Sequence, residues 1–230
     1  MQSNGRGILV GQTGTGKSTL AAELIAKKRN LLIIDPKHQF YPSQKYELVT
    51  NPDELANTAN KAFVETEGKL AILYRPPIET LEDLSEINRV FLFAFLRQNT
   101  FVYVDEGTSV TKSPMTYPFY LKAIYTQGRG RNVGILTATQ RPVGLPGFIF
   151  SESGRLWKFY LSLLSDQERM AEYMGNVVVE PKDKRVSAHD RTDNGEISHT
   201  FYFKDINLVG EAKQYELVID TGAVRKGENE

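Results

Sequence analysis

Residues 11–18 read GQTGTGKS and match the pattern Gly-x4-Gly-Lys-Ser at every fixed position. The glycines of such a loop let successive backbone N–H groups turn toward a phosphate, and the helix that follows adds its positive amino-terminal end. In this pattern Lys17 reaches the β- and γ-phosphates, and the Ser18 hydroxyl ligates Mg²⁺. The sequence therefore predicts a P-loop for ATP and Mg²⁺. The expected nucleotide contacts are Gly11, Thr13, Gly14, Thr15, Gly16, Lys17, Ser18 and Thr19.

A second group of candidate residues follows an apolar strand pattern at residues 101–104, where Asp105 and Glu106 stand side by side. An open α/β sheet binds its ligand at the carboxyl ends of its strands. Neighbouring residues on a strand point to opposite faces, so the two carboxylates should have different tasks. We expect Asp105 to hold Mg²⁺ together with Ser18, and Glu106 to be the general base that polarises the attacking water. An isolated Asp-Glu pair is more often a solvated strand end, but the P-loop upstream favours the catalytic interpretation.

A third group surrounds the strand pattern at residues 133–137. Gln140 follows that strand and could hydrogen-bond the γ-phosphate. Just before the strand, Arg129 and Arg131 alternate with glycines, and planar guanidinium groups on such a turn suit bidentate phosphate contacts. In a ring, one of these arginines would stabilise charge on a neighbouring subunit's γ-phosphate. The alternatives are a polar strand end without function and a basic surface turn.

The elements that must position these residues alternate along the first two thirds of the chain. Strand patterns occupy residues 7–10, 31–35, 69–74, 101–104, 133–137 and 155–160. Helical patterns occupy residues 17–28, 52–63 with Asn51 as N-cap, a segment starting near Thr80, 117–126 and 166–174. This alternation predicts an α/β fold with a mainly parallel sheet and helices on both faces. With the P-loop and the Asp105–Glu106 pair, the predicted fold resembles the RecA-like (ASCE) P-loop class.

The last part of the chain has a different character, since antiparallel strands are expected there with a strong turn signal at residues 193–195, Asp-Asn-Gly. We therefore expect a single P-loop ATPase domain over residues 1–230. Its core should cover about residues 5–175, followed by a β-rich extension at about 176–220 and a flexible tail at 221–230.

Composition narrows the chemistry further. The absence of cysteine excludes disulfides, Cys-ligated zinc and thiol catalysis, and the three histidines show no metal-ligand spacing. The longest apolar run, residues 90–96, is too short to span a bilayer, so we expect no integral membrane segment. Lys plus Arg and Asp plus Glu both number 28, yet residues 107–151 contain no acidic side chain. A local basic face near the nucleotide motifs favours contact with polyanions.

Together, four blocks resemble the FtsK-HerA class of P-loop DNA-pumping ATPases: residues 11–18, 34–37 (IDPK), 104–106 (VDE) and 130–142 (GRNVGILTATQRP). The last block is the most specific, and the resemblance covers about residues 5–175. It implies that Arg131 acts on the neighbouring subunit's nucleotide and that Gln140 is the γ-phosphate sensor. Arg129 remains the alternative to Arg131.

The subclass follows from what precedes the first strand. The chain reaches that strand within a few residues of Met1, so we expect a motor core without membrane segments or an amino-terminal barrel. This minimal form resembles the genome-packaging ATPases of icosahedral viruses and phages with internal membranes. The resemblance implies an ATP hydrolase that moves double-stranded DNA of any sequence into a preformed capsid. It also implies a pentameric or hexameric ring, a capsid vertex, portal or membrane protein as partner, and a location in the host cytoplasm during assembly or at the packaging vertex.

A ring motor grips the DNA backbone with cations on loops that face its channel. Lys112 lies in one such candidate loop, and Lys182, Lys184 and Arg185 lie in another. Two other functions stay open: an NTP-dependent assembly or secretion ATPase that moves protein, and a P-loop small-molecule kinase. A kinase usually lacks the glutamate after the strand-borne aspartate and carries an Arg-rich lid, and stimulation by DNA would separate packaging from protein movement.

Overall fold

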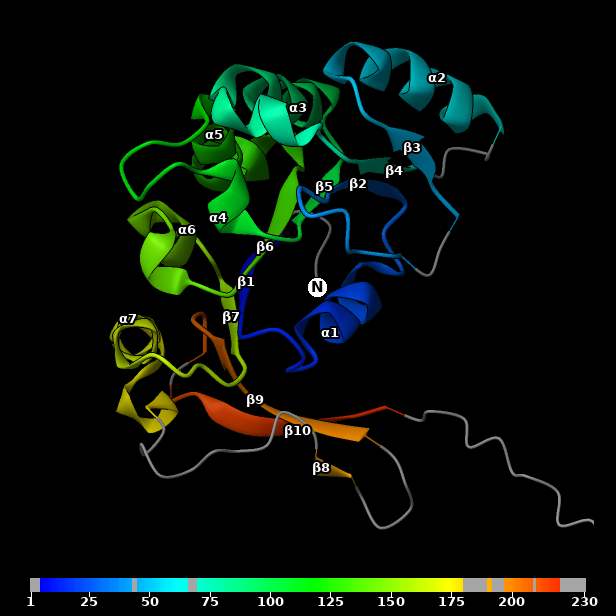
Figure 1. Ribbon diagram of the computed structural model, residues 1–230. Coiled ribbons are helices and arrows are strands. Elements are labelled where there is room, and N and C mark those ends of the chain that lie inside the picture. Colours follow the sequence, from blue (N-terminus) through cyan, green and yellow to red (C-terminus); the bar gives the residue numbers. More distant parts are fainter. Residues whose placement is uncertain are drawn as a thin grey trace, which may run out of the picture.

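The computed structural model describes residues 5–42, 45–65, 70–179, 190–191, 197–208 and 210–219. Within these ranges a ten-stranded sheet runs through the centre in the order β10-β9-β7-β1-β6-β5-β2-β4-β3, with β8 paired to β9 (Figure 1). The strands are β1 Arg6–Val10, β2 Asn30–Ile34, β3 Glu47–Val49, β4 Leu70–Tyr74, β5 Phe101–Val104, β6 Gly134–Thr139, β7 Arg155–Lys158, β8 Asp190–Arg191, β9 Ile197–Asp205 and β10 Lys213–Ile219.

Helices cover both faces of this sheet. The α-helices are α1 Lys17–Ile25, α2 Leu55–Glu65, α3 Leu84–Arg97, α4 Gly107–Val110, α5 Phe119–Gln127, α6 Gly147–Ser151 and α7 Leu164–Met174. Helix α1 packs on one face, whereas α2, α3, α5, α6 and α7 pack on the other (Figure 1). The strands from β7 to β3 are parallel, and β9 and β10 are antiparallel. The predicted fold class is therefore confirmed.

Burial on both faces explains why the strands read as continuous apolar runs. In β2, Leu32 and Ile34 join the larger core beneath α3 and α5, while Leu31 and Ile33 join the core beneath α1. All four side chains are at most 1% exposed. A central parallel strand covered by helices on both sides needs apolar residues at every position, so the usual alternation with polar residues is lost.

Several predicted boundaries differ from the structure by a few residues, and two helices show this most clearly. The helix expected near Thr80 begins at Leu84, because Asp83 caps it by accepting a 2.9 Å hydrogen bond from the Ser85 N–H, and residues 78–82 form a 3-10 turn instead. The helix expected to reach residue 28 ends at Ile25. The Asn51 cap is confirmed, since its side chain accepts a hydrogen bond from the Asp53 N–H. The turn at 193–195 and the tail at 221–230 lie outside the described residues.

The C-terminal strands extend the central sheet. Strand β9 pairs with β7, with Arg155 opposite Asp205 and Trp157 opposite Phe203, and β10 then pairs with β9. Because β7 is the direct neighbour of β1, this return brings residues near position 200 close to the loop that follows β1. The same arrangement is visible in Figure 1, where β9 passes below the start of α1.

Helix α3 allows a test of the packing in the larger core, which lies between the sheet and helices α3 and α5. Phe91 is 0% exposed, whereas Leu96 on the same helix is 60% exposed. We expect Phe91→Ala to lower the free energy of unfolding by about 3–5 kcal/mol, because it removes buried apolar surface and leaves a cavity. Leu96→Ala should change it by no more than about 0.5 kcal/mol. Denaturant unfolding of both variants gives the comparison, and equal losses would contradict the assigned packing.

Candidate nucleotide site

The loop after β1 has the backbone geometry that phosphate binding requires. Gly14 and Gly16 adopt φ angles of 80° and 88°, in the left-handed region that glycine enters without strain. Gly16 is the N-cap of α1, no side chain caps the helix, and its first turn holds no acidic residue. The N–H groups at this end therefore have no side-chain acceptor, and an anion placed there would receive their hydrogen bonds.

Contacts with neighbouring strands hold this loop in position. The Gly11 N–H donates to the Thr139 carbonyl at 3.1 Å, and the Gln12 N–H donates to the Tyr160 carbonyl at the same distance. The Thr15 hydroxyl donates to the Gln12 carbonyl at 2.8 Å. A Cβ atom on Gly11 would lie only 2.6 Å from the Cβ of Phe159, so no larger residue fits there. Gly11 and Thr15 thus shape the loop.

Lys17 lies at the bottom of the loop and is 7% exposed. Burial lowers the pKa of its ammonium group below the ordinary value, although the carboxylates of Asp105 and Glu106 act in the opposite direction. A buried cation beside carboxylates can bind a polyanion with little competition from water. This position agrees with the predicted contact to phosphate.

Asp105 lies at the end of β5 and is also 7% exposed. Burial raises the pKa of its carboxyl group, while the hydrogen bond from Tyr103 and the charge of Lys17 oppose that rise. The Tyr103 hydroxyl donates to Oδ1 at 2.7 Å, which fixes the orientation of the carboxylate. Asp105 and Ser18 line the same cavity, and this pair of oxygen donors fits Mg²⁺.

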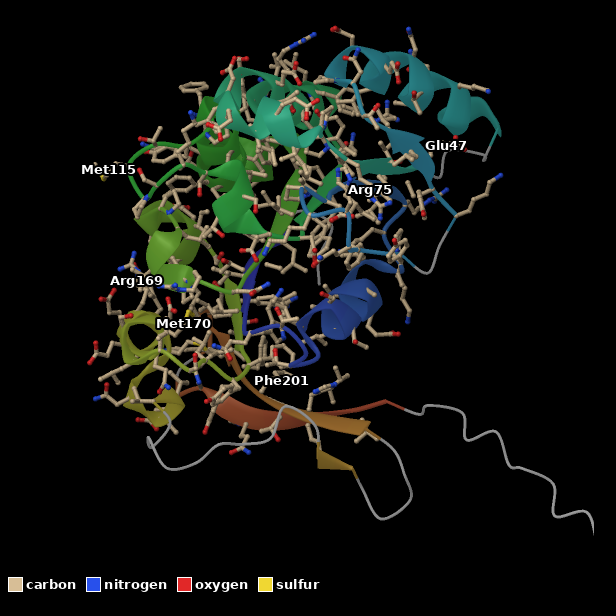
Figure 2. The ribbon with its side chains drawn as sticks, viewed as in Figure 1. Glu47, Arg75, Met115, Arg169, Met170 and Phe201 are labelled. Carbon is tan, nitrogen blue, oxygen red and sulfur yellow. The ribbon has the colours of Figure 1, made fainter. Side chains whose placement is uncertain are left out.

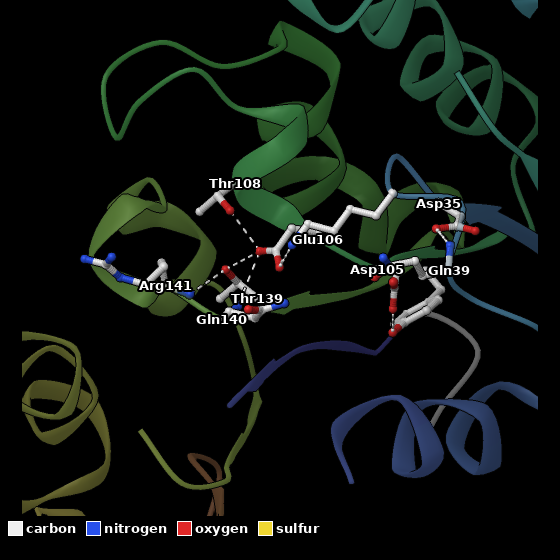
Figure 3. A network of polar contacts seen from close by, with 10 residues as sticks. Asp35, Gln39, Asp105, Glu106, Thr108, Thr139, Gln140 and Arg141 are labelled. Atoms are coloured by element: carbon white, nitrogen blue, oxygen red, sulfur yellow. Dashed lines mark hydrogen bonds and ion pairs between the residues drawn. The ribbon is translucent and has the colours of Figure 1, made fainter. Parts of the chain in front are cut away.

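Glu106 is 2% exposed and is the most extensively hydrogen-bonded of the predicted catalytic residues (Figure 3). Its Oε1 accepts from the Thr139 hydroxyl at 2.7 Å, the Thr108 hydroxyl at 2.8 Å and the Gln140 N–H at 3.3 Å. Burial acts to raise the pKa of the carboxyl group, but the hydrogen bonds from Thr139, Lys37 and Thr108 and the charge of Lys37 outweigh it and lower the pKa. The group is a carboxylate at neutral pH.

Lys37 is a residue of the site to which sequence reasoning assigned no role. Its Nζ lies 3.0 Å from Oε2 of Glu106, and its side chain is 36% exposed. Although it belongs to the IDPK block, its partner becomes visible only when β2 and β5 are known to be neighbours. The sequence did offer one signal for a functional role, because Lys37 follows the carboxyl end of β2, and an open α/β sheet binds its ligand at that edge.

The turn that carries Lys37 is held by Asp35, which is 0% exposed. Oδ1 of Asp35 accepts from the Gln39 N–H at 3.1 Å, and Oδ2 accepts from the Phe40 N–H at 3.1 Å and from Arg75 Nε at 2.9 Å. These contacts satisfy the buried carboxylate. They also fix the path of the chain on both sides of Lys37.

A cavity of about 330 Å³ joins these elements at the carboxyl edge of the sheet. Its lining residues are Gln12, Thr13, Gly14, Gly16, Lys17, Ser18, Thr19, Lys37, Gln39, Asp105, Glu106, Gln140 and His199. Most of the predicted nucleotide, metal and catalytic residues are therefore brought together. His199, from β9, is one of the three histidines whose spacing does not suit a metal site, and the sequence predicted no other role for it.

The two arginines predicted to act on a nucleotide are placed elsewhere. Arg129 and Arg131 lie in the 3-10 turn Gly128–Arg131, which precedes β6 and so sits at the amino edge of the sheet. The Arg131 guanidinium stacks 4.3 Å from the centre of the Phe95 ring, and Arg129 lines a separate cavity with Arg6 and Arg155. The structure does not bring either arginine to the P-loop of its own chain, and action across subunits stays a prediction.

The candidate DNA contacts divide into two cases. Lys112 is exposed in the loop between α4 and α5, where its N–H donates to the Thr116 carbonyl at 2.9 Å. The same loop carries Met115, which is 87% exposed and lies at the periphery of the molecule (Figure 2). Lys182, Lys184 and Arg185 lie outside the described residues.

No helix in the described part of the chain has the length and apolar character needed to cross a membrane.

The chain is similar in sequence to a phage protein. No protein-family model matches the chain. The DNA packaging ATPase P9 of Enterobacteria phage PRD1 is 29% identical over 173 residues, which cover 75% of this chain and 70% of the relative.

Solved structures of a second viral packaging protein have a fold similar to that of this chain. The genome packaging NTPase B204 from Sulfolobus turreted icosahedral virus 2 superimposes with a TM-score of 0.69 as its sulfate complex, covering 96% of this chain and 100% of the neighbour at 16% identity. Its complex with ATP-gammaS gives a TM-score of 0.67, with coverages of 95% and 100% and the same identity. The chain thus resembles a viral genome-packaging ATPase in sequence and shares the fold of another, as its motifs predict.

Proposed function

We propose that this chain is an ATP hydrolase that drives double-stranded DNA into a viral capsid. The observation that carries the hydrolase proposal is the single cavity in which Lys17 and Ser18 of the P-loop face Asp105 and Glu106 of β5. The sequence relative is a phage DNA packaging ATPase, which supports the packaging role. The DNA, the ring and the capsid partner are part of the proposal.

The residues divide the chemistry of hydrolysis between them. The backbone N–H groups at the start of α1 and the ammonium group of Lys17 bind the phosphates. Ser18 and Asp105 would hold Mg²⁺, which neutralises charge on the phosphates when it is bound. Glu106 orients the attacking water and takes up its proton, and Gln140, whose N–H already contacts Glu106, would sense the γ-phosphate.

Lys37 positions the base in this scheme. It holds Oε2 of Glu106 from the β2 side, while Thr108 and Thr139 hold Oε1 from the α4 and β6 sides. A carboxylate with all these partners is ionised and oriented, and Oε2, which accepts from Lys37, is the oxygen through which Glu106 would bond the attacking water. Exchange of the Lys37 contact for one to the γ-phosphate would free Oε2 when ATP binds.

Our prediction for the P-loop and the base separates binding from turnover. Lys17→Ala should weaken ATP binding, because it removes the buried cation at the phosphates. Glu106→Gln should keep ATP bound and lower the turnover rate by about a hundredfold or more, since it removes the base. Direct nucleotide binding and steady-state hydrolysis measure the two effects, with Glu23→Gln on exposed α1 surface as the matched control. Near-normal turnover of Glu106→Gln would contradict the role given to Glu106.

The contact between Lys37 and Glu106 predicts a change in pH dependence. Lys37 lowers the pKa of Glu106, so the wild-type carboxylate stays ionised further into the acid range. In Lys37→Gln that pKa should rise, and the acid limb of the kcat/KM profile, which reports groups of the free enzyme, should move to higher pH. The profile of Lys27→Gln, which changes an exposed lysine beyond the end of α1, should match the wild type. Superimposable wild-type and Lys37→Gln profiles would show that Lys37 does not tune the base.

The packaging proposal predicts that long duplex DNA stimulates ATP hydrolysis and that Lys112 contributes to DNA binding. Lys112→Ala should weaken duplex binding equally for unrelated sequences and reduce the slope of log affinity against log salt by about 1. Lys27→Ala is the control for loss of one exposed positive charge. Fluorescence anisotropy over a range of salt concentrations measures both effects. Hydrolysis that ignores DNA would instead favour an ATPase that moves protein, and an unchanged salt slope would exclude Lys112 from the DNA contact.

A further inference from the structure

The antiparallel return of β9 places one face of that strand against the P-loop side of the sheet. Phe203 packs on Trp157 and Phe201 packs on Phe159, each with ring centres 5.2 Å apart. Both phenylalanines belong to the core beneath α1, whereas Tyr202 between them packs in the core on the other face. Side chains two residues apart share a face of a strand, so this alternation directs His199 to the α1 side.

The side chain of His199 lies directly against the glycine that starts α1. A Cβ atom added to Gly16 would meet Cγ and Cδ2 of the imidazole at 2.6 Å, so only a glycine leaves room for the ring here. His199 is 6% exposed and lines the cavity of the P-loop. A titratable ring that can donate a hydrogen bond thus forms part of the wall beside the phosphate-binding N–H groups.

We propose that His199 is a nucleotide-binding residue, which donates a hydrogen bond from its imidazole to the α- or β-phosphate of a nucleotide in the P-loop. This inference rests on the proposed function, because it requires that a nucleotide occupies the cavity. The backbone of a P-loop cradles the α- and β-phosphates, and His199 touches that backbone at Gly16. Glu106 and Gln140 belong to the γ-phosphate end of the proposed site, so His199 should contribute equally to ADP and ATP.

Variants of His199 separate hydrogen bonding from packing. His199→Ala removes both, His199→Phe keeps a ring against Gly16 without a donor, and His199→Gln keeps a donor without the ring. Thr200→Ala is the matched control, since Thr200 is the next residue of β9 and points to the opposite face. Affinities for ADP and for a non-hydrolysable ATP analogue are measured by calorimetry on the full chain, together with thermal unfolding.

The proposal predicts that Ala and Phe weaken binding of both nucleotides about tenfold or more and by the same factor, because a hydrogen bond to a charged phosphate is lost. Gln should recover most of the affinity, and Thr200→Ala should bind like the wild type. Recovery by Phe would overturn the proposal in favour of packing, and wild-type affinity of all three variants would overturn it outright. If the Phe variant does not fold, the comparison of Ala with Gln decides, since equal losses in these two contradict a hydrogen bond.

Lys17→Ala, measured in parallel, distinguishes this failure from failure of the proposed function. If the wild type binds neither nucleotide, or if Lys17→Ala binds both as well as the wild type does, the P-loop does not serve as proposed and the inference falls with it. If Lys17→Ala weakens binding while the His199 variants do not, the nucleotide site stands and only the role of His199 is refuted.

Discussion

The buried carboxylate of Glu106 is the constraint on which the arrangement of the site depends. A charge that is 2% exposed is tolerated only when hydrogen bonds and an opposite charge replace its water. Here the partners come from three different segments: Lys37 after β2, Thr108 in α4 and Thr139 at the end of β6. The side-by-side order of β2, β5 and β6 is therefore a requirement of this one group as well as of the core.

The residues that contact the functional side chains must themselves be held in place. Lys37 can reach Glu106 only because its turn is fixed, and that turn is fixed by a second buried carboxylate, Asp35, with Arg75 from the end of β4. Tyr103 performs the corresponding task for Asp105 from two residues earlier on the same strand. The carboxylates of Glu106 and Asp105 are thus held by neighbours that belong to the apolar framework or are anchored to it, which is how a site keeps its geometry without a ligand.

The features that the sequence predicted correctly depend on residues that lie close together in the chain, and the site residues it missed depend on residues far apart in the chain. The P-loop and the Asp105–Glu106 pair could be predicted because strand, turn and helix chemistry within a few residues determines them. The predicted start of α3 near Thr80 was wrong, because Asp83 caps the helix and so sets its first residue at Leu84, whereas the apolar periodicity alone indicates an earlier start. Lys37 and His199 could not be assigned a role, because their neighbours follow from strand order. His199 reaches the site because β9 pairs antiparallel with β7, although about forty residues separate the two strands in the chain. The sequence predicts antiparallel strands in this region, but it does not predict with which strand they pair.

The placement of Arg129 and Arg131 at the amino edge of the sheet, with the P-loop at the carboxyl edge, has a consequence for symmetry. If an arginine of one copy meets the nucleotide of another, the two contacting surfaces are different ones. Such a contact is heterologous, and repetition of it generates a closed ring or an open helical filament according to the rotation between copies. A two-fold dimer pairs a surface with itself, so it would not arise from this contact.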